Sequence, residues 1–224
     1  MAEQNFSDRR TRAFIEDYDR IVVFVADAWG VTRDEFRVYS GGVSVPIKDF
    51  YSNPHEGHEI NLILGRQLDP EQPCFVVRSG ISVAAQPKGI YDTAEFASRY
   101  TYEGKLGASI ESGRTVFRVW APFAQSVRLN IYGDGETGSN YYGGVMTRGE
   151  RGVWTATLDA DLAGWYYTYT MSYNGRADVE TVDPYAVSGG MNARRGMIAD
   201  LSSPRLTPYG WAEEHEAYKK KHPL

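Results

Sequence analysis

The chain has 224 residues, of which 42% are hydrophobic and 24% charged, a composition typical of globular proteins with one large domain or two small ones. The net charge of −5, with both signs interspersed along the chain, argues against a nucleic-acid partner. No apolar run is long enough to cross a bilayer and the polar stretch 1–12 is not a secretory signal, so we expect no membrane partner and a cytoplasmic location if Met1 is the natural start.

Short apolar runs separated by turn residues fill the region from Phe14 to about Pro87. The runs of strand length are 21–25, 36–39, 43–45, 60–64, 74–77 and 81–83. Several short strands with frequent turns predict a β-sandwich, and we assign this first domain to residues 1–90. Cys74 is the single cysteine of the chain and lies in one of these runs, so we expect a buried, inert thiol without an internal disulfide.

A short helix is predicted in the linker 91–105 between two domains. Asp92 is a suitable N-cap residue, and Glu95 three positions later completes the pattern of a capping box. We expect this helix to end at about Tyr100.

Alternating apolar residues predict two strands at the start of the second domain. Thr115–Ala121 is the first strand and ends at Pro122, because proline cannot donate a hydrogen bond to a sheet. Val127–Tyr132 is the second, with Val127, Leu129 and Ile131 on one face. Together the two strands predict half of a second β-sandwich.

A hairpin is predicted further along the same domain. The tyrosine-rich strand Tyr166–Tyr173 is followed by Asn174–Gly175, a dipeptide that favours a type I′ turn because both of its residues tolerate positive φ. The partner strand is expected over 179–182. After Trp211 the residues 212–224 form a charged tail, which we predict to be helical.

The sequences of these segments resemble those of a known family. The resemblance rests on Leu106-Gly-Ala, Phe117-Arg-Val-Trp-Ala-Pro122, Gly152-Val-Trp154, Gly164-Trp-Tyr-Tyr-Thr-Tyr169, Asp183-Pro-Tyr-Ala186, Met191-Asn192 with Arg195–Leu201, and Pro208–Trp211. In this order they resemble the α-glucan module called carbohydrate-binding module family 48, and in particular the module of type I pullulanases. The resemblance extends from about Tyr91 to Trp211.

The resemblance implies an all-β fold with two tandem immunoglobulin-like β-sandwich domains, the second at 106–211. It implies the non-catalytic N-terminal part of a starch, glycogen or pullulan debranching enzyme that hydrolyses α-1,6 linkages, cut just before its catalytic barrel. The expected partners are that barrel, within the same protein, and α-glucan. Two alternatives remain: a separate α-glucan-binding or regulatory adaptor, and the N-terminal part of an isoamylase-type or branching enzyme.

No catalytic residue is predicted in this chain. Retaining hydrolysis of a glycosidic bond needs two carboxylates about 5 Å apart, which debranching enzymes carry on barrel loops. The carboxylates here lie in expected turns and strand ends, where such residues shape the backbone. We therefore expect the chain alone to be inactive, and we predict no cofactor.

Two further motifs carry little weight. Gly133–Gly138 matches the glycine pattern of dinucleotide sites, but loop residues follow it where such a site needs a helix N-terminus. His55 and His58 are three positions apart, yet zinc needs further ligands at suitable positions. We interpret the histidine segment as a solvated loop and predict no metal site.

Glucan binding is the function that we take forward from the sequence. Its sites pair an exposed aromatic surface with polar side chains at the edges. The candidate rings are Tyr141 and Tyr142 in a glycine-flanked loop and Trp165 at the start of the tyrosine-rich strand, with Lys105 or Arg148 as polar partners. Trp120 and Trp154 alternate with core residues and are expected to be buried.

The chain departs from the family at the expected sugar site. Stronger glucan binders of the family carry a tryptophan after the second strand and a lysine in the strand before the hairpin. This chain has Tyr132–Gly135 and Thr168–Tyr173 at these stretches, with neither residue. We therefore expect weak binding or binding on a different face.

Overall fold

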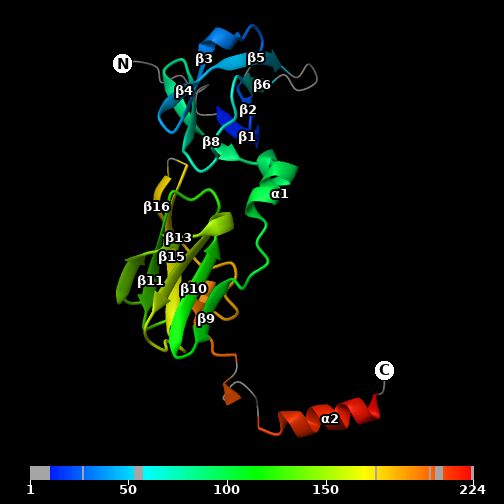
Figure 1. Ribbon diagram of the computed structural model, residues 1–224, viewed down its shortest axis with the longest axis vertical. Helices are drawn as coiled ribbons and strands as arrows, with labels where there is room; N and C mark the ends of the chain where they lie inside the picture. The colour runs from blue at the N-terminus through cyan, green and yellow to red at the C-terminus, as the bar shows by residue number, and fades with distance from the viewer. Residues whose placement is uncertain are drawn as a thin grey trace.

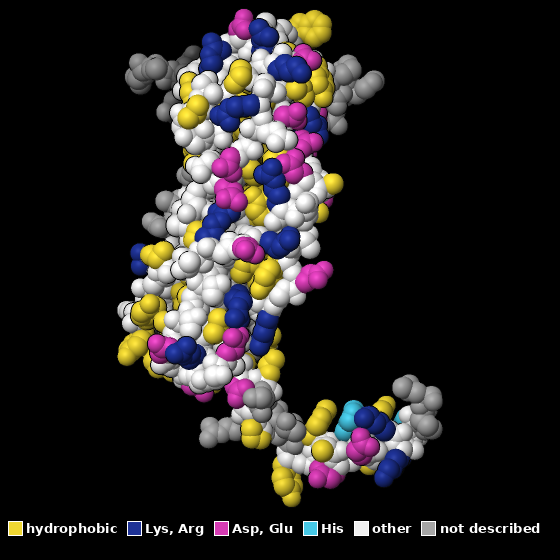
Figure 2. Space-filling view, viewed as in Figure 1, with side chains coloured by type: hydrophobic (Ala, Val, Ile, Leu, Met, Phe, Trp, Pro, Cys, Tyr) yellow, Lys and Arg dark blue, Asp and Glu magenta, His cyan; other side chains and the backbone are white. Residues whose placement is uncertain are grey.

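The computed structural model describes residues 11–26, 28–52, 58–174, 176–201, 203–204 and 209–222. Two β domains are stacked end to end along the long axis, with helix α1 beside their junction and helix α2 beyond the second domain (Figure 1). Basic and acidic side chains are interspersed over the visible face of both domains (Figure 2). Both domains are built from strands, so the predicted all-β class is confirmed.

The first domain is a continuous path of eight strands in the order β4-β3-β7-β8-β1-β2-β6-β5. The strands are β1 (Arg12–Asp17), β2 (Arg20–Phe24), β3 (Phe36–Ser40), β4 (Val43–Val45), β5 (Ile47–Ser52), β6 (Glu59–Leu64), β7 (Cys74–Arg78) and β8 (Ile81–Pro87). Their inward side chains form one core, which includes Ile21, Val38, Ile60 and Val76. Cys74 is buried in this core, and burial raises the pKa of its thiol to about 12, as expected for an inert thiol.

The sequence did not reveal two of these strands. β1 has alternating buried residues at Ala13 and Ile15, but it lies at the start of the chain among charged residues. β1 also pairs in parallel with β8, whereas its pairing with β2 is antiparallel. β5 is the last strand of the path and has no fully buried side chain, so no apolar alternation marks it.

The linker helix is present, with a different cap from the one predicted. A short 3-10 helix, η3 (Gly89–Asp92), precedes α1 (Ala94–Tyr100). Thr93 is the N-cap of α1, and its hydroxyl oxygen accepts a hydrogen bond of 3.1 Å from the Phe96 amide. Asp92 is not the cap, because it is the last residue of η3 and Thr93 takes the extended conformation that a cap requires.

The second domain is a sandwich of two antiparallel sheets, with orders β13-β14-β10-β9 and β12-β11-β15-β16, and β17 added beside β15. The strands are β9 (Gly107–Glu111), β10 (Arg114–Trp120), β11 (Ser126–Tyr132), β12 (Tyr142–Val145), β13 (Thr147–Arg148), β14 (Val153–Leu158), β15 (Tyr166–Tyr173), β16 (Arg176–Thr181) and β17 (Gly196–Met197). Val127, Leu129 and Ile131 are all buried in its core, so the predicted alternation is confirmed.

The predicted hairpin joins β15 and β16, and its tip contacts the first domain. Asn174 has a positive φ of 41°, while Gly175 lies outside the described residues. The Asn174 side chain is buried: its oxygen accepts from the Cys74 amide at 3.0 Å, and its nitrogen donates to the Ala85 carbonyl. The backbone amide of Asn174 donates to the Gln125 side chain at 2.7 Å. The hairpin tip therefore joins the second domain to strands β7 and β8.

Further contacts complete the junction between the domains. Phe123 belongs to the core of the first domain, and half-buried Trp120 and Tyr173 pack against that core. The Trp120 indole N–H donates to the Tyr100 carbonyl at 2.9 Å. Trp154 is buried in the second core as expected, whereas Trp120 lies at the junction.

The charged tail forms the predicted helix. α2 (Trp211–Lys221) has acidic residues in its first turn and lysines in its last turn, which suits the helix dipole. None of its residues is buried. No helix in the described part of the chain is long and apolar enough to cross a membrane.

Other 3-10 helices are η2 (Arg33–Glu35), η4 (Glu150–Gly152) and η5 (Met191–Ala193).

Candidate functional site

The glycine-rich segment Gly133–Gly138 forms a compact loop after β11, and no helix follows it. The Asp134 carboxylate accepts hydrogen bonds from the amides of Glu136 and Thr137 at 2.9 and 2.8 Å. These bonds lower the pKa of Asp134. The backbone amides of the loop are therefore bonded within the loop itself, so the loop does not have the geometry of a dinucleotide site.

Arg195 fixes the same loop from the other side. Its guanidinium donates to the carbonyls of Asp134, Thr137 and Gly138 at 2.7, 2.6 and 3.0 Å. The guanidinium carbon also lies 3.6 Å from the centre of the Tyr132 ring. The loop that leads into the tyrosine pair is thus held by hydrogen bonds and by a cation–π contact.

Tyr141 and Trp165 meet at the end of the second domain away from the junction. Their ring centres are 5.1 Å apart in an edge-to-face arrangement with an interplanar angle of 61°. Tyr141 is 78% exposed, and its amide donates to the Ile131 carbonyl at 2.8 Å. Trp165 is half buried, with its amide bonded to the Leu162 carbonyl. We call Tyr141 and Trp165 the aromatic platform.

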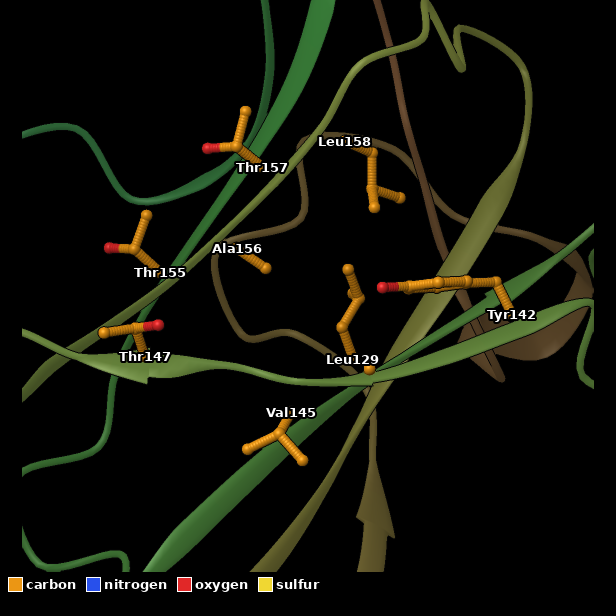
Figure 3. A pocket seen from close by; sticks show the side chains of 9 residues that line it. Leu129, Tyr142, Val145, Thr147, Thr155, Ala156, Thr157 and Leu158 are labelled. Atoms are coloured by element: carbon orange, nitrogen blue, oxygen red, sulfur yellow. The ribbon is translucent and has the colours of Figure 1, made fainter.

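Tyr142 is directed elsewhere. It begins β12 and pairs with Ile131, a core residue, so its side chain lies on the side of the sheet that faces the other sheet. Its ring forms one wall of a groove between the sheets (Figure 3). The two tyrosines therefore belong to two different surfaces.

The two predicted cations lie apart from the platform. Arg148 is at the junction, where it pairs with Glu71 at 2.7 Å and donates to the Pro122 carbonyl at 2.7 Å. Lys105 is exposed just before β9, whose first residue Gly107 pairs with Arg118, close to the junction end of β10. Neither residue is placed to contact a sugar that stacks on the platform.

A polar row that the sequence reasoning missed lies across β11, β15 and β16. The Asn130 amide donates to the Thr170 hydroxyl at 2.8 Å. The hydroxyls of Thr168 and Tyr132 each donate to Glu180 Oε1 at 2.6 Å, and these bonds lower the pKa of Glu180. The polar residues that alternate with the core residues of β11 are the signal that could have revealed this row.

Of the two histidines His55 and His58, His55 lies outside the described residues. The described residues contain no group of three or more histidine, cysteine, aspartate or glutamate side chains that could hold a metal ion. In the quoted motif Pro208–Trp211, Pro208 also lies outside the described residues.

Comparison with known proteins gives this geometry its context. Residues 105–186 match the family model described as carbohydrate-binding module 48, the isoamylase N-terminal domain. The pullulanase of Bacillus subtilis strain 168 is 34% identical over 125 residues, which cover 56% of this chain and 17% of that protein. The chain thus spans about a sixth of that relative.

Two solved structures resemble the whole arrangement. The type I pullulanase of Bacillus subtilis strain 168, complexed with maltose, is 25% identical with a TM-score of 0.66, over 91% of this chain and 28% of that one. A pullulanase from Anoxybacillus sp. LM18-11, complexed with maltotriose, is 26% identical with a TM-score of 0.64, over 85% and 28%. Residues 105–186 thus match a family 48 carbohydrate-binding module, and the chain is similar to the N-terminal region of pullulanases.

Proposed function

We propose that this chain is the non-catalytic N-terminal part of a debranching enzyme, and that its second domain contacts α-glucan through the aromatic platform. In this proposal the full protein hydrolyses α-1,6 linkages of starch, glycogen or pullulan with a catalytic barrel outside this chain. The observation that carries the glucan contact is the meeting of Tyr141 and Trp165 on the surface of a family 48 module.

The chemistry of the platform suits a glucan. A pyranose ring has an apolar C–H face and hydroxyl groups at its edge, so it stacks on an aromatic ring and leaves its hydroxyls to water. Tyr141 offers an exposed ring whose position is already set by the contact with Trp165 and by the bond from its amide to Ile131. Because the ring is ordered before binding, less side-chain entropy is lost when a sugar stacks on it.

Three carboxylates of the second domain have structural partners, which supports assigning the hydrolysis to the rest of the protein. Asp134 closes a turn, and Glu180 accepts two hydroxyl groups. Asp183 is buried and accepts from the Tyr167 hydroxyl at 2.7 Å, and its burial raises its pKa. Each of these groups thus has a structural role.

The junction suggests how the two domains would serve a barrel. The buried hydrogen bonds of the Asn174 side chain with Cys74 and Ala85, and the pair between Glu71 and Arg148, join the second domain to the first. A rigid pair of domains would hold the platform at a constant position relative to a catalytic domain that follows it. We include this supporting role in the proposal.

Native electrophoresis of the 224-residue chain through gels that contain pullulan, amylopectin or glycogen tests the glucan contact. We expect retardation that Tyr141→Ala abolishes. Tyr51→Ala is the matched control, because Tyr51 is an exposed tyrosine on β5 of the first domain. Equal retardation of Tyr141→Ala and the unmodified chain would refute the platform as the binding surface, and release of reducing ends by this chain alone would refute its non-catalytic role.

A further inference from the structure

A groove of about 460 Å³ opens between the two sheets of the second domain, where residues of β12 and β14 line its sides. β12 is the outermost strand of its sheet, and β13 pairs with β14 only as far as Thr155, so both strands have free edges here among the described residues. Leu129, Leu158 and Tyr142 point toward one another across the groove, while the threonine side chains of β14 point away (Figure 3). The groove has an apolar bottom and one aromatic wall.

A glycine allows Tyr142 to reach into this groove. Gly144 follows on the same face of β12, and a Cβ atom there would lie 2.5 Å from the Tyr142 hydroxyl oxygen and 2.9 Å from two carbons of its ring. No real side chain tolerates such distances, so any larger residue at this position would displace the ring. Tyr142 is 44% exposed in this position and is available to a ligand.

The lining residues select for a neutral ligand that combines apolar surface with hydroxyl groups. None of the nine residues that line the groove carries a charge, so an ion or a nucleotide would have no countercharge there. The polar groups at the rim are the hydroxyls of Tyr142 and Thr147 and the unpaired backbone of β14. Its volume lies within the range of about 300–1,000 Å³ that is usual for small-molecule sites.

The groove and the aromatic platform meet at consecutive residues of the chain. Tyr141 belongs to the platform and Tyr142 to the groove, and the Cα atoms of neighbouring residues are about 3.8 Å apart. Their side chains point to opposite sides of β12, which is the outermost strand of its sheet, so a glucan chain that stacks on Tyr141 would have to pass around this edge to place another unit beside Tyr142.

We propose that the groove is a second subsite for α-linked glucose units, which takes one unit of the same chain that stacks on the platform. This inference rests on the proposed function. Two contacts on one oligosaccharide raise its affinity above that of either contact alone, because the second contact forms within the complex. The proposal therefore predicts that affinity rises with oligosaccharide length, and that long oligosaccharides depend on both tyrosines.

Isothermal titration of the 224-residue chain with maltose, maltotriose and maltoheptaose tests this proposal. The informative variants are Tyr142→Ala and Gly144→Ala, of which the second displaces the Tyr142 ring without removing any side chain from the groove. We expect each variant to weaken maltoheptaose binding at least about threefold, and Tyr51→Ala to leave it unchanged. Thermal unfolding of each variant shows whether it is folded. If Tyr142→Ala does not fold, the result for Gly144→Ala alone decides whether the groove binds the oligosaccharide.

The outcomes separate the groove from the platform. If Tyr141→Ala weakens binding while Tyr142→Ala and Gly144→Ala do not, the groove is refuted and the proposed function stands. If only the two groove variants weaken binding, the groove is supported and the platform is refuted. An affinity that is equal for maltose and maltoheptaose refutes the joint use of the two surfaces, and no binding of any oligosaccharide refutes both.

Discussion

The two ends of the second domain are built in different ways. At the junction, the polar atoms of Asn174 are buried and bonded to the first domain, and Phe123, Trp120 and Tyr173 pack on the core of that domain. At the far end, Tyr141 is exposed and has a single aromatic neighbour. Buried, fully bonded groups fix geometry, whereas exposed rings remain available to a ligand. The difference agrees with the proposal that one end serves assembly and the other serves binding.

Asn174→Ala should produce the largest effect and should affect stability. The variant leaves the Cys74 amide and the Ala85 carbonyl buried without their partners, and it places alanine at a positive φ. We expect the free energy of unfolding to fall by about 3 kcal/mol, because each unpaired buried group costs about 1–3 kcal/mol. Urea unfolding measures this loss.

Asn192→Ala is the control for this variant. Asn192 also has a positive φ, of 57°, but it is exposed and makes no buried contact between domains. The fall in the free energy of unfolding of Asn192→Ala should therefore reflect the cost of the backbone conformation alone. Equal losses for the two variants would contradict the role of Asn174 as the bond between the domains.

Tyr141→Ala should affect binding and leave stability unchanged. We expect glucan affinity to fall about tenfold, equivalent to about 1.4 kcal/mol, and the free energy of unfolding to change by less than about 0.5 kcal/mol, as is usual for exposed positions. Titration with maltoheptaose and urea unfolding measure the two quantities. A loss of stability like that of Asn174→Ala would mean that the two ends do not differ in the way we describe.

Sequence reasoning predicted the elements better than the site. Alternation identified β10 and β11, because their inward residues Val119, Leu129 and others fill a core. It did not reveal β5, whose residues have little to bury at the sheet edge. The meeting of Tyr141 with Trp165, and the place of Arg148 at the junction, depend on contacts between distant segments that no local pattern records.

Glu71→Gln tests the outer part of the junction and should have a smaller effect. Glu71 Oε1 accepts from the Tyr100 hydroxyl at 2.8 Å and pairs with Arg148 at 2.7 Å. Both side chains of the ion pair are partly exposed, so we expect a loss of about 1 kcal/mol in urea unfolding, well below that of Asn174→Ala. A loss as large as that of Asn174→Ala would place the main bond between the domains at Glu71.

The smallest expected effect is a dependence of stability on pH that comes from β9, which belongs to the other sheet than the strands beside the platform. Hydrogen bonds from Arg118 and then Ser109 lower the pKa of Glu111 to about 2. Because the folded pKa lies below the unfolded value of about 4.5, this contribution is present above pH 4.5 and is lost as the pH falls toward 2. Glu111 is partly exposed, so solvent screening keeps the contribution below about 1 kcal/mol.

Glu111→Gln should therefore reduce the slope of unfolding free energy against pH between 4.5 and 2, while Glu213→Gln on the exposed helix α2 should leave it unchanged. Neither variant alters a group at the junction or the platform, so glucan binding at neutral pH should stay the same for both. A change in glucan affinity in Glu111→Gln would mean that β9 influences the platform, and the pH dependence of stability would then not be separate from binding.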